Sequence, residues 1–255
     1  MITSKRNQRL RELKKLQDRK RRRETGLFVA EGEDLVGQAL AHGAAPVAVF
    51  SVRGAGLPFS LPDGVEHVEA TAEALSSVSS LGSGSRVIGV FEQRWADLAG
   101  LAPGACAVYL HDVADPGNVG TVLRAAHAFA ARPVVLSDRT ADPFGPKAVR
   151  ASMGAVFVVP LARAPLVESR TALGLRAIAL VPGEGAALRA LDLDHPVLFV
   201  LGSERTGLPE AIVGGCDEVA HVPLSPEGAD SLNVAMTATL CLYESAVHRL
   251  SPTLD

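Results

Sequence analysis

The sequence predicts an α/β protein with a small N-terminal α/β domain and a larger C-terminal domain built on a mostly parallel sheet. In the second half of the chain, short apolar runs such as CAVYL and VLFVL alternate with stretches whose apolar residues recur at helical spacing. Such runs are typical of strands buried on both faces, with helices as crossover connections. Hydrophobic residues make up 47% of the 255 residues, which is enough for a sizeable core.

Composition excludes several classes of protein. The chain has no run of about 18 uncharged apolar residues, the length that a membrane-spanning helix needs. The basic N-terminus lacks the apolar core of a secretory signal. The three cysteines, Cys106, Cys216 and Cys241, fit neither a CxxC pair nor a zinc spacing. We therefore expect reduced thiols, no metal and a cytoplasmic protein.

Charge is distributed unevenly along the chain. Residues 1–24 hold 11 Lys/Arg and 3 Asp/Glu, whereas the chain as a whole has a net charge of −3. Leu10, Leu13 and Leu16 predict a helix with one narrow apolar stripe over residues 4–26, ending at Gly26. A basic arm on an acidic body favours contact with RNA phosphates, and the alternative is a solvated helix face. The candidate RNA contacts are Arg19, Lys20, Arg21, Arg22 and Arg23.

The N-terminal domain is expected to span residues 1–94. After the basic helix, the pattern predicts a strand, a turn at Glu31 and Gly32, and a helix that ends at Gly43. A strand at 46–52, a strand running into a helix at 67–81 and a strand at 86–93 follow. Residues 95–105 contain Gly100, Pro103 and Gly104 and are the expected linker.

The C-terminal domain, residues 106–255, alternates strands and helices. The expected strands are 106–113, 133–138, 156–161, 176–183, 197–204 and 219–224. Helices are expected after Asn118, before Gly154 and from Ser231 to the end of the apolar-periodic segment. The last helix is apolar around much of its circumference, which predicts burial against the sheet or against another subunit.

Familiar catalytic motifs are absent. The chain has no P-loop, no GxSxG, no GxGxxG after a strand and no HExxH. Instead, two predicted strands, which we expect to lie side by side, end at glycine- and proline-rich loops, in GSERTGLPE and in HVPLSPEGADSLN. Ligands of open α/β sheets bind beyond the carboxyl ends of strands, so we expect a pocket there.

Three stretches together resemble the motifs of a known family. They are Asn118-x-Gly120-x-x-x-Arg124, Gly202-x-Glu204-x-x-Gly207-Leu208-Pro209, and Pro223-Leu224 followed by Ser231-Leu232-Asn233-Val234. In this order they resemble the SpoU (TrmH-type) RNA ribose 2′-O-methyltransferases of the SPOUT superfamily. One departure is that Ser225-Pro226-Glu227 makes the third loop about one residue longer than is usual in the family.

The resemblance implies a fold and an activity. It implies a deep trefoil knot, a homodimer through the C-terminal domain and S-adenosylmethionine as methyl donor. The basic helix followed by Phe28-Val29-x-Glu31-Gly32 resembles the ribosomal-protein-like substrate-binding domain of this family. Ribosomal RNA is therefore the expected substrate and transfer RNA the runner-up. The rivals are a non-catalytic RNA-binding or ribosome assembly factor and a methyltransferase of bases.

The resemblance also implies site residues. The implied catalytic residues are Arg124, Asn118, Glu204, Ser231 and Asn233. Structural alternatives are a helix N-cap for Asn118 or Ser231 and a surface salt bridge for Arg124. The implied cofactor-binding residues are Leu180, Val181, Leu201, Gly202, Val222, Leu224 and Leu232. Arg150 could contact RNA or the partner subunit, or could be an ordinary solvated residue.

Overall fold

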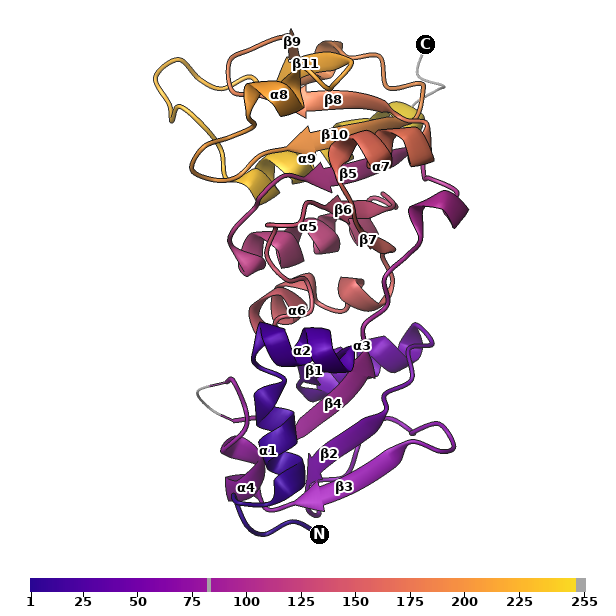
Figure 1. Ribbon diagram of the computed structural model, residues 1–255, viewed down its shortest axis with the longest axis vertical. Coiled ribbons are helices and arrows are strands. Elements are labelled where there is room, and N and C mark those ends of the chain that lie inside the picture. Colours follow the sequence, from indigo (N-terminus) through magenta and orange to yellow (C-terminus); the bar gives the residue numbers. More distant parts are fainter. Residues whose placement is uncertain (82–83, 251–255) are drawn as a thin grey trace. The chain divides into compact units, whose positions relative to one another are not determined.

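The computed structural model describes residues 1–81 and 84–250, and its chain divides into two units of mixed α/β structure (Figure 1). The first unit comprises Met1–Gln93 and Asp142–Val158, and the second comprises Arg94–Ala141 and Val159–Asp255. Residues 142–158, which the sequence analysis places in the C-terminal domain, thus pack within the first unit.

The first unit is built on a four-stranded sheet in the order β1-β4-β2-β3. Its strands are β1 (Leu27–Glu31), β2 (Ala48–Val52), β3 (Glu66–Ala70) and β4 (Val87–Glu92). β4 is antiparallel to both neighbours, and β2 and β3 are parallel. The helices are α1 (Gln8–Lys15), α2 (Arg19–Thr25), α3 (Glu33–Ala41) and α4 (Ala72–Ser76). The strands and helices predicted after the basic arm are confirmed.

The basic arm forms two helices instead of the one that we predicted. The break follows from local chemistry, because the Asp18 side chain accepts a hydrogen bond from the Lys20 amide at 2.7 Å and so starts a new helix. Gly26 ends α2 in the left-handed conformation, as predicted (φ +68°). Leu10, Leu13 and Leu16 are buried against one face of the sheet. The arm is therefore part of the core of this unit.

The segment 142–158 contains α6 (Pro146–Ser152) and the short 3-10 helix Ala155–Phe157. The strand predicted at 156–161 is therefore wrong. Phe157 instead packs its ring against Phe28 of β1 and Phe91 of β4, with ring centroids 5.6 and 4.7 Å apart. Phe144 joins the same aromatic cluster, 4.9 Å from Phe28. These rings explain why an apolar run of strand-like composition does not form a strand here.

The second unit is built on a seven-stranded sheet in the order β7-β6-β5-β10-β8-β11-β9. Every pair of neighbours in it is parallel, which confirms and extends the prediction of a mostly parallel sheet. Its strands are β5 (Cys106–Leu110), β6 (Val134–Leu136), β7 (Leu161–Arg163), β8 (Arg176–Leu180), β9 (Ala186–Ala187), β10 (Val197–Leu201) and β11 (Glu218–His221). β9 lacks a counterpart in the prediction, and β7 overlaps the strand predicted at 156–161 only at Leu161.

Helices cover both faces of this sheet. α7 (Leu166–Leu173) packs on the face that carries Tyr109, Leu198 and Val200. α5 (Pro116–Ala128) and α9 (Val234–Leu250) contact each other, and α9 contacts β5 and β10. The short α8 (Glu210–Val213) precedes β11. Within residues 1–81 and 84–250, no helix has both the length and the apolar character that a membrane span needs.

Candidate active site

The three motifs meet at the carboxyl edge of the seven-stranded sheet. Loop 111–115 follows β5, loop 202–209 follows β10, and loop 222–233 follows β11. We predicted that β10 and β11 lie side by side, but β8 lies between them. The loop after β8, which includes Val181, therefore occupies the middle of the pocket edge.

Glu204 is held by groups from the loop after β5. Its carboxylate accepts hydrogen bonds from the amides of Ala114 at 3.1 Å and Asp115 at 3.3 Å, and from Asn118 Nδ2 at 2.7 Å. Burial alone would raise the pKa of Glu204, but the hydrogen bonds from Asn118 and from backbone amides lower it below its usual range. The carboxylate is therefore charged at neutral pH and ties the second motif to the first.

Asn118 and Asn233 continue this connection into the third motif. Asn118 Oδ1 accepts a hydrogen bond from Asn233 Nδ2 at 3.0 Å. Asn233 Oδ1 in turn accepts from the amides of Ala235 at 2.8 Å and Met236 at 3.4 Å, at the start of α9. A single chain of hydrogen bonds, which we call the Glu204–Asn118–Asn233 network, therefore joins all three motifs.

The helix caps differ from the expected ones. Asp115, not Asn118, caps α5, because its side chain accepts from the Gly117 amide at 2.5 Å and Pro116 follows at the first helical position. Asn233 caps α9, which begins at Val234, so the structural alternative of Ser231 as the cap is wrong. The Asp-Pro pair was the sequence signal for the first cap. Asn118 is consequently free to serve the network.

Gly202 is required by the loop that carries Glu204. A Cβ at this position would lie 2.3 Å from the carbonyl carbon of Gly207. The loop is this narrow because two backbone hydrogen bonds, of 3.0 and 3.2 Å, join Ser203 and Gly207. The close packing inside this turn thus accounts for Gly202 without reference to a ligand.

Arg124 lies apart from the network. It is exposed on α5, six residues after Asn118, which places it about 240° around the helix from Asn118. The alternative of a surface salt bridge finds no support, because the Arg124 side chain has no hydrogen bond or ion pair within the described part of the chain. All the donors of its guanidinium are available to a ligand.

A small cavity lies beside the network, at the ends of β8 and β11. Its volume is about 60 Å³, and Ser231 and Leu232 line it together with residues that follow the two strands. Five of the seven predicted cofactor-binding residues line it: Leu180, Val181, Val222, Leu224 and Leu232. Leu201 is buried in β10 and, like Gly202, does not line it. The cavity is well below the roughly 300–1,000 Å³ of typical ligand pockets.

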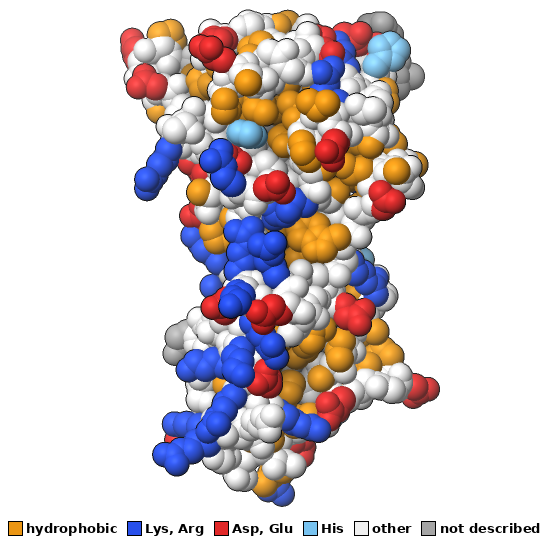
Figure 2. Space-filling model, viewed as in Figure 1, with side chains coloured by type: hydrophobic (Ala, Val, Ile, Leu, Met, Phe, Trp, Pro, Cys, Tyr) orange, Lys and Arg blue, Asp and Glu red, His pale blue; other side chains and the backbone are white. Residues whose placement is uncertain are grey.

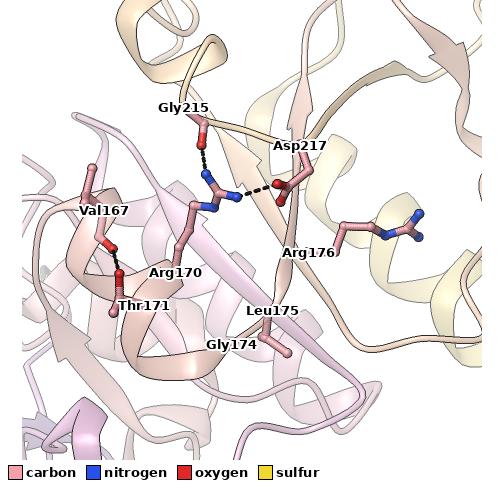
Figure 3. Close-up of a pocket in the computed structure, with 8 residues that line it drawn as sticks. All are labelled: Val167, Arg170, Thr171, Gly174, Leu175, Arg176, Gly215 and Asp217. Carbon is pink, nitrogen blue, oxygen red and sulfur yellow. Dashed lines mark hydrogen bonds and ion pairs between the residues drawn. The ribbon is translucent and has the colours of Figure 1, made fainter.

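A larger cavity of about 710 Å³ lies at the opposite edge, before β8 and β11 (Figure 3). Its charged groups are already paired, since Arg170 donates to the Gly215 carbonyl and lies 2.5 Å from Asp217. Arg176 extends away from Arg170 and pairs with Glu218 at 2.5 Å. No motif residue lines this cavity, so we do not assign the chemistry to it. Among the described residues, no group of three His, Cys, Asp or Glu is placed to hold a metal ion.

The predicted RNA contacts in the first unit fall into two groups. The Arg22 side chain is 4% exposed and donates to Asp142 at 2.7 Å and to the carbonyls of Leu16 and Gln17, so it is a structural residue and cannot contact RNA as predicted. Arg21 pairs with Glu12 at 2.8 Å, and Arg150 donates to Ser80 Oγ at 2.7 Å. Arg19, Lys20 and Arg23 are exposed and have no ion pair within the described residues.

Two known protein-family models match the chain. Residues 105–243 match the model of the SpoU rRNA Methylase family, and residues 7–89 match that of the MRM3-like substrate binding domain. The chain belongs to the SpoU rRNA methylase family. The predicted family and fold class are thereby confirmed.

Relatives of this family member span almost its whole length. The chain is 31% identical to a 23S rRNA (guanosine(2553)-2'-O)-methyltransferase, RlmP, of Bacillus subtilis, over 95% of this chain and 97% of that protein. The AdoMet-bound rRNA methyltransferase structure from Sinorhizobium meliloti superposes with a TM-score of 0.87 at 31% identity, over 98% of both chains. The SpoU methyltransferase AviRb of Streptomyces viridochromogenes, in complex with AdoMet, has a TM-score of 0.84 at 25% identity, over 97% of this chain and 100% of that one.

We predict that Glu204→Gln lowers stability at neutral pH and that this loss shrinks as the pH falls. The pKa of folded Glu204 is depressed, so its contribution is present above the unfolded value of about 4.3 and is lost as the pH falls through the lower folded-state pKa. With a discount for solvent exposure, the loss should be on the order of 1 kcal/mol.

Urea unfolding of wild type and variant, from about pH 7 down to about pH 3, measures this difference. Glu168→Gln, at an exposed carboxylate of α7, is the control and should change stability little at any pH. Equal behaviour of the two variants would contradict the role given to Glu204.

Proposed function

We propose that this protein transfers a methyl group from S-adenosylmethionine to a ribose 2′-hydroxyl of RNA, with ribosomal RNA as the favoured substrate. The observation that carries the proposal is the Glu204–Asn118–Asn233 network, which joins the three motif loops beside the cavity. The relatives named as 23S rRNA 2′-O-methyltransferases support ribosomal over transfer RNA.

The residues around the cavity have the chemical character that binding an adenosine needs, but the cavity is too small to hold one. Apolar side chains and strand-end backbone from β8 and β11 suit the flat apolar faces and polar edges of a nucleoside. When bound, S-adenosylmethionine would supply a methyl carbon activated by its positive sulfur. To admit it, residues 222–232 must move outward while Asn233 stays in the network, and the exposure of most of these residues makes that movement possible. Leu201 and Gly202 remain predicted contacts through their backbone.

Arg124 supplies positive charge for the RNA. A guanidinium keeps its proton at all physiological pH values, so Arg124 cannot act as a general base. Its unpartnered donors can bind the phosphate next to the reacting ribose and stabilise the 2′-oxygen as negative charge develops there. Asn118, Glu204 and Asn233 hold the loop and the helix from which Arg124 projects, and Ser231 lines the cavity.

We predict that Arg124→Ala reduces methyl transfer at least about 100-fold while S-adenosylmethionine binding is unchanged, because charge stabilisation acts in the transition state. Transfer of labelled methyl to total RNA from cells that lack the protein measures activity, and calorimetry measures binding. Arg132→Ala, an exposed arginine before β6, is the matched control. Loss of binding together with transfer would contradict the role of Arg124.

The same assay separates the rival functions. Label in the large ribosomal RNA supports the favoured substrate, whereas label in transfer RNA supports the runner-up. Alkaline digestion then distinguishes ribose from base methylation, because a 2′-O-methyl group blocks cleavage at the modified position. Absence of both label and cofactor binding supports a non-catalytic RNA-binding factor.

The first unit would bind RNA through cations that have no acidic partner. Lys and Arg side chains gather over α1 and α2 (Figure 2). Of the 11 in residues 1–24, five pair with acidic groups: Lys5, Arg9, Lys15, Arg21 and Arg22. The other six are exposed and unpaired within the described residues: Arg6, Arg11, Lys14, Arg19, Lys20 and Arg23. These six side chains can therefore contact phosphates without breaking an existing ion pair.

We predict that the triple variant Arg19→Ala, Lys20→Ala, Arg23→Ala weakens RNA binding and flattens its salt dependence by about two to three units of log–log slope. The triple variant Lys5→Ala, Arg9→Ala, Lys15→Ala removes the same charge from paired positions and should have a smaller effect on both. Equal effects would show that net charge alone matters. Deletion of residues 1–24 is unsuitable, because it removes the buried Leu10, Leu13 and Leu16.

A homodimer through the C-terminal unit is part of the proposal. Met236, Leu240 and Tyr243 of α9 are 60%, 38% and 49% exposed, and their spacing of four and three residues places them on one helix face. Phe129, at the end of α5, packs edge-on against Tyr243 with ring centroids 6.1 Å apart. An apolar face of this kind is typical of a subunit interface.

We predict that Leu240→Glu converts a dimer into monomers, because it places a charge in the apolar interface. Sedimentation velocity measures the change. Val167→Glu, at a more exposed valine of α7, is the control and should leave the dimer intact. A wild-type monomer, or a dimer that survives Leu240→Glu, would contradict this interface. The trefoil knot is also a proposal. So is a cytoplasmic location, where the protein would encounter ribosomal RNA.

A further inference from the structure

Loop 137–141, which follows β6, is fastened at several points although it contains no residue of the three motifs. Thr140 is fully buried and donates to the Leu110 carbonyl at 2.8 Å, and the Ala141 amide donates to the Val113 carbonyl at 2.9 Å. Arg163, at the end of β7, donates to the carbonyls of Ser137, Asp138 and Thr140. The loop is therefore a rigid platform on the carboxyl ends of β5 and β7.

Asp112, two residues after the end of β5, orients the one long cationic side chain that this platform presents. Its backbone is in the left-handed region (φ +54°), which aspartate tolerates better than most residues. Its carboxylate accepts from Ser137 Oγ at 2.7 Å and from Arg139 Nη2 at 2.5 Å. Burial would raise the pKa of Asp112, but these two partners lower it, so the carboxylate is charged at neutral pH.

Stability does not explain this ion pair. The Arg139 side chain is 82% exposed, and pairs that exposed contribute about 0–1 kcal/mol. Asp112 already has a hydrogen-bond donor in Ser137. What the pair achieves is to hold an exposed guanidinium in one direction, with its remaining donors facing solvent.

The position of Arg139 connects it to the candidate active site. Asp112 lies in loop 111–115, and the amides of Ala114 and Asp115 in the same loop bind Glu204. Arg139 and Glu204 thus bind different residues of one short loop, directly before the helix that carries Asn118 and Arg124.

We propose that Arg139 is a substrate-positioning residue that binds a phosphate of the RNA close to the methylated ribose, and that Asp112 sets the direction of its guanidinium. The planar fork of arginine matches two phosphate oxygens, and a fork already held in place loses less freedom on binding. A phosphate contact positions the strand without reading its sequence. This inference rests on the proposed function.

The test uses four full-length variants: Arg139→Ala, Arg139→Lys, Asp112→Asn and Arg132→Ala. Arg132 precedes β6 and Arg139 follows it, so the control removes an exposed arginine from the opposite end of one strand. The probe is ribosomal RNA from cells that lack the protein, with RNA affinity measured over a range of salt concentrations. Methyl transfer, S-adenosylmethionine affinity and melting temperature are measured on the same proteins.

We expect Arg139→Ala to weaken RNA binding about 10-fold and to lower the salt slope by about one, with cofactor affinity and melting temperature unchanged. Arg139→Lys keeps the positive charge but loses the planar fork of the guanidinium. The salt slope should therefore equal that of the wild type, whereas the RNA affinity should lie between those of the wild type and Arg139→Ala. Asp112→Asn should weaken RNA binding without changing the salt slope. Arg132→Ala should match the wild type.

The inference is overturned if Arg139→Ala binds RNA like Arg132→Ala, or if it lowers melting temperature and cofactor affinity in proportion to RNA affinity. RNA binding is measured separately from methyl transfer. Wild-type protein that binds RNA with an Arg139-dependent salt slope but transfers no methyl group would refute the proposed activity and support the phosphate contact.

Discussion

The arrangement of the catalytic unit depends on one carboxylate and the donors that hold it. Glu204 follows a buried parallel strand but is itself exposed, so its hydrogen bonds contribute on the order of 1 kcal/mol. Two amides of the loop after β5 and the Asn118 side chain satisfy it, across 86 to 90 residues of sequence. Asn118 then binds Asn233, 115 residues further along, which caps α9. Loops from separate strands are thereby held in one geometry, because the carboxyl ends of parallel strands share one edge of the sheet.

Much of this arrangement could be predicted from the sequence, because it depends on local pattern. Apolar runs marked the longer strands, and the glycine- and proline-rich stretches after two of them marked the loops that carry Glu204 and Asn233. Strand order could not be predicted in this way. β10 and β11 both end in motif loops, but crossover connections of the chain place β8 between them, and no local pattern records that choice.

The remaining errors share a physical cause, which is tertiary contact between segments far apart in the sequence. The apolar run at 156–161 is compatible with a strand or with a short buried turn. The turn forms because Phe157 packs against the rings of Phe28 and Phe91. Arg22 lies in the middle of a basic run, yet Asp142, 120 residues away, buries it in an ion pair. Basic composition therefore indicates a surface for a polyanion without indicating which cations belong to it.

Rigidity is distributed unevenly around the candidate site, and the chemistry explains why. A methyl transfer from an activated donor needs alignment more than reactive side chains, and alignment can supply up to about 7–11 kcal/mol of barrier reduction. Loops 111–115 and 137–141, which would face the RNA backbone, are held by several hydrogen bonds to their neighbours. Residues 222–232 beside the small cavity are mostly exposed and have few such bonds, which is typical of segments that open locally at low cost in free energy. The side that would align the ribose is thus formed in advance, whereas the side that would admit the methyl donor can move.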